Sequence, residues 1–405
     1  MAAEPGAMGA MGSDPIGVMS ETPAIPLALY VHFPWCVKKC PYCDFNSHAL
    51  RGAQAGEIPE RAYVDALLRD LDFELRDGES RPLSSVFFGG GTPSLFSAQA
   101  VGRVLEGVQR RLGFLSGAEI TLEANPGTAE AGRFRGYRDA GVNRLSIGAQ
   151  SFDAAKLKAL GRIHGPDEAR RAVQLARDAG FDNLNLDLMY ALPQQTPAEA
   201  EADLRAAFAL APEHLSYYHL TLEPNTGFHA RPPALPDAEA AWSMQERGQA
   251  LLAAHGYAQY EVSAYARAGR RCRHNLNYWQ YGDYLGIGAG AHGKRTAADG
   301  SIRRRARHKL PRTYLGTAGT AAALQEDQAV AAGELPFEYA MNALRLNDGF
   351  GLDEFQRRTG LGPEALERPL AAARERGLIE ADAAGVRATA RGQTYLNQLT
   401  ALFLP

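Results

Sequence analysis

The chain has 405 residues, 45% of them hydrophobic, which is typical of a folded protein with a large core and room for a smaller unit. Its 43 Lys and Arg residues nearly balance its 46 Asp and Glu residues, so the net charge of −3 argues against broad nucleic-acid binding. No run approaches the roughly 20 apolar residues of a membrane span. Residues 1–24 contain no Lys or Arg and no apolar stretch, so we predict a disordered tail rather than a secretory signal.

Short β-rich runs alternate with amphipathic helical runs from Leu27 onward. We predict helices after Pro59, at 167–179 and at 197–211, because apolar residues recur there at helical spacing. The predicted strands are 27–32, 85–88, 119–123, 144–147, 183–188 and 214–218. Repeated β-α units predict a parallel sheet with helices outside, curled into a partial or full barrel. Ligand sites are then expected at the carboxyl ends of the strands.

The regular alternation fades after about Gly293. Residues 301–312 are basic and are predicted to form a loop within a linker that spans 301–335. Short helical runs and two glycine-led β segments then predict a small helical or winged-helix-like unit at 336–405, whose simplest role is packing. The core unit is therefore expected to span 25–300.

Three of the four cysteines, Cys36, Cys40 and Cys43, follow directly on the first predicted strand. Clustered cysteines in a chain without a predicted signal indicate metal ligation in a reducing cytoplasm rather than a disulfide framework. Four-iron clusters normally take four thiolates, so three would leave one iron open. A zinc site with His32 or His48 as a further ligand is the alternative, although the spacing is not typical of zinc.

The spacing C-x3-C-x2-C, with Phe45 two residues after the last cysteine, resembles the signature of the radical SAM superfamily. That resemblance implies a [4Fe-4S] cluster on Cys36, Cys40 and Cys43. Its open iron would bind the amino and carboxylate groups of S-adenosylmethionine (SAM). The implied fold is an α/β radical SAM partial (β/α) barrel with a small C-terminal helical, winged-helix-like domain.

Further motifs narrow the resemblance. The run GGGTP from Gly89, EANPG from Glu123, RLSIGAQSF from Arg144 and DLMYALP from Asp187 are similar to the oxygen-independent coproporphyrinogen III oxidase family, from about Leu27 to the C-terminus. Carboxylates can bind ribose hydroxyls, and an arginine can bind a carboxylate. By that resemblance the SAM contacts are Tyr30, Phe45, Gly90, Gly91, Thr92, Glu123, Gln150, Arg162 and Asp187.

That family contains true oxidases and heme chaperones of the HemW type. The oxidases carry a cysteine two residues after the third cluster cysteine, where this chain has Phe45. The chaperones carry an H-N-x-x-Y-W motif, which is present here from His274 to Trp279. The resemblance implies that His274, Tyr278 and Trp279 bind heme, with His274 on the heme iron. Imidazole is a common axial ligand, and flat aromatic rings can pack on a porphyrin.

Other residues near this motif leave alternatives open. Cys272 could be a second heme ligand, a covalent attachment point or a buried residue without a role, and the last is our default. His292 is a weaker second candidate for a heme ligand. The basic run is usually a solvated surface, whereas the sharper hypothesis is that one or two of its arginines, among them Arg303, Arg304 and Arg305, bind heme propionates.

The resemblance therefore implies a heme chaperone, expected in the cytoplasm, that carries a [4Fe-4S] cluster, SAM and heme. It would pass heme to an acceptor protein, with membrane-associated proteins among the candidates, and would have no nucleic-acid partner and no transmembrane segment. The alternatives are an anaerobic coproporphyrinogen III oxidase, which Phe45 argues against, and a zinc-binding structural protein. Catalytic residues stay unassigned, and whether the chain is an enzyme stays open.

Overall fold

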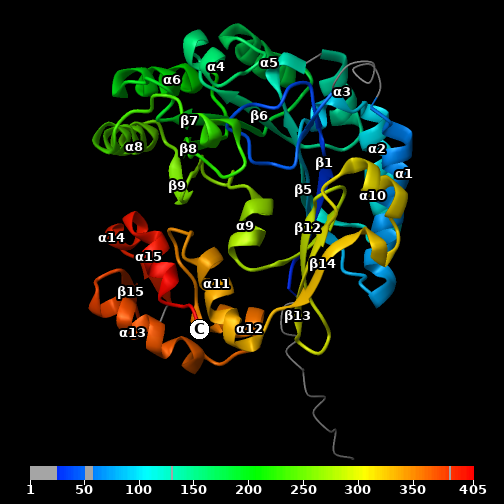
Figure 1. Ribbon diagram of the computed structural model, residues 1–405, viewed down its shortest axis with the longest axis vertical. Coiled ribbons are helices and arrows are strands. Elements are labelled where there is room, and N and C mark those ends of the chain that lie inside the picture. Colours follow the sequence, from blue (N-terminus) through cyan, green and yellow to red (C-terminus); the bar gives the residue numbers. More distant parts are fainter. Residues whose placement is uncertain (1–24, 51–57, 129–130, 383–384) are drawn as a thin grey trace, which may run out of the picture.

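The computed structural model describes residues 25–50, 58–128, 131–382 and 385–405. The tail predicted at 1–24 lies outside the described residues. A large α/β unit is built around one long sheet. A smaller helical unit, formed by the C-terminal residues, lies beside this large unit (Figure 1). The predicted α/β class and the predicted C-terminal helical domain are both confirmed.

The centre of the long sheet is a run of parallel strands. These are, in spatial order, β11 (Asp283–Ile287), β1 (Leu27–Phe33), β4 (Leu83–Gly90), β5 (Phe114–Ala124), β6 (Arg144–Gln150), β7 (Leu184–Tyr190) and β8 (His214–His219). All six predicted strands belong to this run. From β1 to β8 the spatial order follows the chain order, as expected when each parallel strand returns through a helical crossover.

Antiparallel strands extend both edges of the sheet. Beyond β8 lie β10 (Ala264–Ala266) and β9 (Ala258–Glu261), and beyond β11 lie β12 (His292–Thr296), β13 (Ile302–Arg307) and β14 (Leu324–Ala329). The loop predicted at 301–312 is therefore wrong for residues 302–307. These residues form a strand in spite of their basic character, because carboxylates on neighbouring elements pair with the arginines. The limits predicted for the core unit and the C-terminal domain stay predictions.

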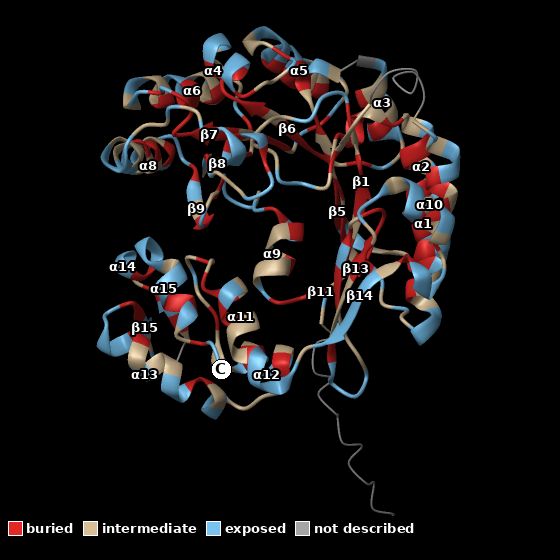
Figure 2. Cartoon of the chain, in the orientation of Figure 1, coloured by how far each residue is buried: buried red, intermediate tan, exposed pale blue. Residues whose placement is uncertain are grey.

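Helices cover the outer face of the sheet, with their buried residues turned toward it (Figure 2). The helix predicted after Pro59 and those predicted at 167–179 and 197–211 are confirmed, with small shifts at their ends. The helices of the large unit are α1 (Glu60–Glu74), α2 (Ala98–Arg111), α3 (Ala131–Asp139), α4 (Ala154–Ala159), α5 (Pro166–Asp178), α6 (Pro197–Ala209), α7 (Gly227–Ala230), α8 (Ala238–Ala254), α9 (Arg273–Trp279) and α10 (Pro311–Thr317).

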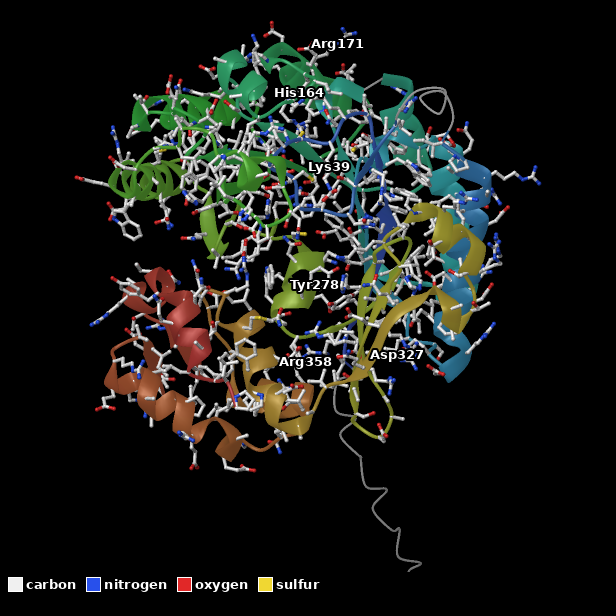
Figure 3. The ribbon with its side chains drawn as sticks, viewed as in Figure 1. Lys39, His164, Arg171, Tyr278, Asp327 and Arg358 are labelled. Carbon is white, nitrogen blue, oxygen red and sulfur yellow. The ribbon has the colours of Figure 1, made fainter. Side chains whose placement is uncertain are left out.

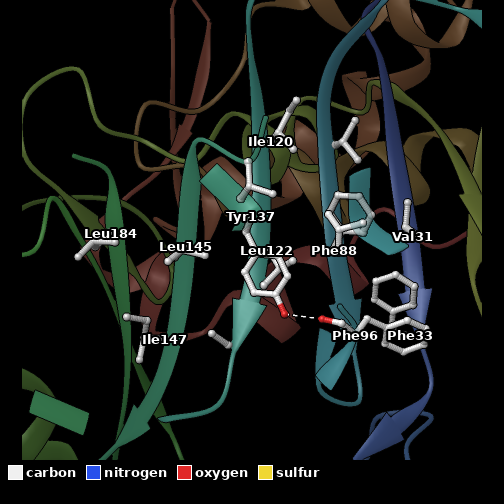
Figure 4. Packing of buried hydrophobic residues seen from close by; sticks show 14 of the residues in the cluster. Val31, Phe33, Phe88, Phe96, Ile120, Leu122, Tyr137, Leu145, Ile147 and Leu184 are labelled. Carbon is white, nitrogen blue, oxygen red and sulfur yellow. Dashed lines mark hydrogen bonds between the residues drawn. The ribbon is translucent and has the colours of Figure 1, made fainter. Parts of the chain in front are cut away.

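The core between the sheet and these helices is aliphatic and aromatic (Figure 4). Leu122 and Leu145, on neighbouring strands, are fully buried. The ring of Phe33 stacks on that of Phe96 with 4.0 Å between centroids. The hydroxyl of Tyr137 donates a hydrogen bond of 2.5 Å to the carbonyl oxygen of Phe96. This close packing fixes the carboxyl ends of the strands relative to one another.

The C-terminal unit has its own core, centred on Tyr339, Phe350 and Phe355 and completed by Tyr281 and Ile302 of the large unit. An antiparallel hairpin lies where the two glycine-led segments predict β structure. The elements are α11 (Leu335–Ala343), α12 (Leu352–Thr359), α13 (Glu367–Glu375), β15 (Ile379–Ala381), β16 (Val386–Ala388), α14 (Ala390–Thr394) and α15 (Leu396–Ala401). None of the described helices is both long enough and apolar enough to span a membrane.

Candidate functional site

The three clustered cysteines lie on a closed loop that follows β1. Cys36 ends β2 (Trp35–Cys36), which pairs in parallel with β3 (His48–Ala49) and so ties the two ends of the loop together. The amide of Cys43 donates to the carbonyl oxygen of Cys40 at 3.1 Å. All three thiols are free; Cys36 is buried, and Cys40 and Cys43 are partly exposed. The loop therefore offers three thiols from one short segment.

Burial raises the pKa of the Cys36 thiol to about 11 and also raises the pKa of Cys43. These thiols stay protonated until a metal ion displaces the proton. Among the residues that the structure describes, no three His, Cys, Asp or Glu side chains are arranged to hold a metal ion. That finding covers the three cysteines as well as any set with His32 or His48, so it does not separate a zinc site from an iron–sulfur cluster.

Next to the cysteine loop, a cavity of 490 Å³ opens at the carboxyl ends of the parallel strands. We call it the cysteine cavity. It brings together all the predicted cluster ligands and all but one of the predicted SAM contacts, which are Cys36, Cys40, Cys43, Phe45, Gly90, Gly91, Thr92, Glu123, Gln150, Arg162 and Asp187. The exception is Tyr30, which lines a different cavity.

The glycines after β4 allow the backbone to lie directly against the cysteine loop. Gly90 has φ = 113°, in the region that favours glycine, and its amide donates to Glu123 Oε2 at 3.2 Å. A Cβ on Gly91 would lie 2.4 Å from the carbonyl oxygen of Trp35. The amide of Thr92 donates to that same oxygen at 2.7 Å. These residues hold the cysteine loop in place as well as lining the cavity.

Two acidic side chains, Glu123 and Asp187, line the cysteine cavity from β5 and β7. Burial, and then the negative charge of Asp187, raise the pKa of Glu123 to about 8. Burial also raises the pKa of Asp187, against hydrogen bonds that its carboxylate accepts from Asn185 at 2.8 Å and Ser146 at 3.1 Å. Two carboxyl groups on one wall suit a ligand that carries positive charge and hydroxyl groups.

Arg162 and Gln150 line the same cavity as these acids. Arg162 donates to Cys40 Sγ at 3.8 Å and to the carbonyl oxygen of Gly148 at 2.8 Å, while its buried Nε has no partner within the described part of the chain. Gln150 has φ = 67°, a strained conformation for a residue with a side chain. Its Oε1 accepts a hydrogen bond from Tyr218 at 2.8 Å. An arginine with a free donor fits the carboxylate group of a ligand.

A second cavity, of 640 Å³, borders the first. We call it the tyrosine cavity. Its walls come from β1, β11, β12, β13, α9 and α11, and it shares Lys39, Asp44 and Phe45 with the cysteine cavity. In Figure 3, Lys39 lies on the cysteine loop above Tyr278 of α9. The aromatic residues that line the tyrosine cavity are Tyr30, Phe45, Tyr278, Trp279, Tyr281 and Tyr284.

The predicted heme residues divide into two groups. Tyr278 and Trp279 line the tyrosine cavity, whereas His274 lines neither cavity. His274 is buried, with Nδ1 at 2.9 Å from Ser85 Oγ and Nε2 at 2.9 Å from Tyr278 Oη. Burial lowers the pKa of its imidazole to about 3. Both ring nitrogens are therefore occupied, and binding of His274 to heme iron stays a prediction that this geometry does not favour.

Cys272 also lies away from both cavities. It is buried, and its thiol donates to Glu119 Oε1 at 3.3 Å. The amides of Arg273 and His274 donate to the same carboxylate, so Glu119 caps the start of α9. Burial raises the pKa of the Cys272 thiol to about 12. These contacts fit our default for Cys272, a buried residue of the structure.

Three arginines of the basic run are paired with acidic residues. Arg303 binds Asp327, Arg304 binds Glu338 and Arg305 binds Glu74. Only Arg304 of these three lines the tyrosine cavity. The sequence prediction missed Lys39, Lys309 and the tyrosines Tyr281 and Tyr284 as lining residues. The alternation of side chains along β11 to β13 is the signal that could have placed some of them on one face.

Comparisons with known proteins follow the same division into two units. The radical SAM superfamily matches residues 30–207, and the HemN C-terminal domain matches residues 330–395. The chain is 51% identical to the heme chaperone HemW of Escherichia coli strain K12, over 94% of this chain and 98% of that protein. It is 49% identical to the heme chaperone HemW of Haemophilus influenzae, again over 94% of this chain and 98% of the relative.

Among solved structures, the fold is similar to that of coproporphyrinogen III oxidase (HemN) from Escherichia coli. The TM-score is 0.78 at 24% sequence identity, over 95% of this chain and 91% of that chain. This likeness extends across both units of the molecule and concerns the fold alone.

Proposed function

The chain belongs to the HemW family of radical SAM proteins, and from that premise we propose that it binds heme and passes it to an acceptor protein, while carrying a SAM-coordinated [4Fe-4S] cluster. The observation that supports this proposal best is the pair of adjoining cavities. One contains the three cysteines, and the other is aromatic and lined by Tyr278 and Trp279 of the H-N-x-x-Y-W motif.

The cysteine cavity fits the cluster and SAM. Cys36, Cys40 and Cys43 would hold three irons and leave the fourth for the amino and carboxylate groups of SAM. In such a complex the cluster supplies the electron that can cleave the sulfonium. Arg162 would bind the carboxylate of the ligand, and Glu123 and Asp187 would face its positive charge and its ribose hydroxyls.

The tyrosine cavity fits a flat, anionic macrocycle. Its volume of 640 Å³ lies within the usual range for small-molecule sites. Tyr278 and Trp279 offer ring faces to a porphyrin, and the cavity is lined by four cationic side chains but by Asp44 alone among acidic ones in the described chain. Separate cavities for SAM and heme would allow both ligands to be bound together.

The remaining parts of the proposal concern location and partners. We infer that the acceptor is a protein that lacks its heme, in or at the membrane of the same cell, and that the chain itself acts in the cytoplasm. No nucleic-acid partner is proposed, because the net charge of −3 offers no broad basic field.

One preparation can test the proposal. Protein reconstituted anaerobically should show iron–sulfur absorption that changes on addition of SAM. Heme titration should produce a stoichiometric Soret band, and heme-loaded protein should transfer heme to an apo-hemoprotein. An assay with SAM, reductant and coproporphyrinogen III completes the test. Sustained formation of protoporphyrinogen, or the absence of heme binding, would overturn the proposal.

A further inference from the structure

Three imidazoles lie in or beside the tyrosine cavity, and they differ in what occupies their nitrogens. His32 is buried; its Nδ1 lies 3.0 Å from Tyr30 Oη and its Nε2 lies 2.8 Å from the carbonyl oxygen of Asn46. His274 is buried with both nitrogens engaged, as described above. His292, the first residue of β12, is exposed and lines the cavity.

His292 has no hydrogen bond from its ring to any residue in the described part of the chain. By contrast, each tyrosine hydroxyl that lines the tyrosine cavity has a hydrogen-bond partner. Tyr30 and Tyr278 lie within hydrogen-bond distance of histidines, Tyr281 donates to Glu338 and Tyr284 accepts from Arg304. A metal ion in the cavity could therefore take His292 as a ligand without breaking a hydrogen bond within the protein.

The cationic side chains of the tyrosine cavity also differ in whether another residue of the protein pairs with them. Lys294 is buried and donates to Asp283 and to the carbonyl oxygen of Tyr281, and Arg304 is paired with Glu338. Lys39 and Lys309 are exposed. Lys39 donates only to the carbonyl oxygen of Phe45 at 3.0 Å, and no ion pair within the described chain neutralises the charge of either lysine. Both charges are available to carboxylates of a ligand.

The heme binding proposed above is the basis for a more specific assignment. We propose that His292, and not His274, is the axial ligand of the heme iron in the tyrosine cavity. The macrocycle packs against Tyr278 and Trp279, and its propionates meet Lys39 and Lys309. His274 then has a positioning role, because its hydrogen bond holds Tyr278 in the cavity wall.

Heme titration of His292→Ala, His274→Ala and the wild type tests the ligand. His292→Ala should lower heme affinity by about tenfold or more and shift the Soret band toward that of heme without a histidine ligand. Free imidazole added to this variant should restore the wild-type spectrum. His229→Ala is the matched control, since His229 lies on α7 and lines neither cavity.

The two histidine variants should fail in different ways. His274→Ala should keep the wild-type heme spectrum but lower the denaturant midpoint, because Ser85 and Tyr278 lose a buried partner. An unchanged spectrum and affinity in His292→Ala, with heme bound normally by the wild type, would overturn the ligand assignment alone. Wild-type protein that binds no heme would overturn the assignment and the proposed function together.

The salt dependence of heme affinity tests the lysine contact separately from the iron ligand. Lys309→Ala should weaken heme binding by about threefold at low salt, and the difference from the wild type should shrink as salt is raised. Lys158→Ala, an exposed lysine of α4 that lines neither cavity, should leave affinity unchanged. Equal affinity of Lys309→Ala and Lys158→Ala at every salt concentration would overturn the propionate contact.

Discussion

The two cavities share a wall but are built in different ways. The cysteine cavity lies at the carboxyl ends of consecutive parallel strands, so each strand contributes its residues just where it ends. The tyrosine cavity combines the inner faces of β1 and the β11–β13 edge with α9 and a residue of the C-terminal unit, Asn342. Their charges also differ, because acidic residues slightly outnumber cationic ones in the lining of the first cavity, whereas cationic residues predominate in the second.

Under the proposed function, this difference would keep two ligands apart within one fold. A positively charged ligand would favour ionisation of Glu123 and Asp187 and pair with them, and a dianion is favoured near Lys39 and Lys309. Phe45 lines both cavities, as do Lys39 and Asp44, so the two environments meet at these residues. The predictions below test whether the cavities are as independent as this arrangement indicates.

The largest effect is expected from replacing all three cysteines of the loop with serine. The variant should lose all iron–sulfur absorption after reconstitution, because no thiolate remains. Heme affinity should stay within about threefold of the wild type. The loop keeps its anchors, since Asn46 donates to the carbonyl oxygens of Ala289 and Lys309 at 2.9 Å. Loss of the heme Soret band in this variant would show that the cavities are not independent.

Gly91→Ala should damage the cysteine cavity through its backbone. The added Cβ would lie 2.4 Å from the carbonyl oxygen of Trp35, so the cysteine loop must shift. We expect a loss of about 2 kcal/mol in unfolding free energy and weaker SAM binding. Gly102→Ala is the control, because Gly102 lies within α2 and its added Cβ would meet the Ala140 Cβ at an ordinary distance of 3.5 Å, which should not destabilise. Equal urea midpoints for the two variants would contradict the close approach.

Glu123→Gln should change the pH dependence of stability. The pKa of Glu123 is raised to about 8, above the value of about 4.3 for an unfolded chain, so near neutral pH the folded state holds a proton that the unfolded state has released. Stability should therefore fall as pH rises, by about 2 kcal/mol between about pH 6.5 and 8 from this group. Urea unfolding at both pH values should show a smaller fall in Glu123→Gln. Parallel slopes would mean that the carboxyl group is not buried as the structure places it.

Arg303→Ala should have the smallest effect. Its ion pair with Asp327 is partly exposed, and Arg303 lines neither cavity. We expect a change below about 0.5 kcal/mol in unfolding free energy and unchanged heme affinity. A clear loss of heme binding in this variant would revive the hypothesis that the basic run binds the propionates.

The part of the molecule that is built from repeated β-α units could be predicted from the sequence. The six parallel strands follow from alternating β and helical runs, and their carboxyl ends bring Glu123, Gln150 and Asp187 into one cavity with the cysteines. Tyr30 is the exception among the expected SAM contacts. Its side chain points from β1 into the tyrosine cavity, which neighbouring strands and helices form only after folding.

The parts that could not be predicted depend on long-range pairing. Strand β13 could not be predicted, because its arginines form ion pairs with acids on α1, β14 and α11, which lie far away in the sequence. The spacing of the H-N-x-x-Y-W motif does, however, indicate which residue His274 contacts. Residues four apart on a helix are neighbours, so His274 and Tyr278 contact each other, and this contact uses the nitrogen that an iron ligand needs.

Helix α9 contacts both units of the molecule. Through His274 it bonds to Ser85 of β4, and at its other end Trp279 lies beneath the guanidinium of Arg345, 4.3 Å from the ring centre. Displacement of Arg345 would therefore uncover one face of Trp279 in the wall of the tyrosine cavity.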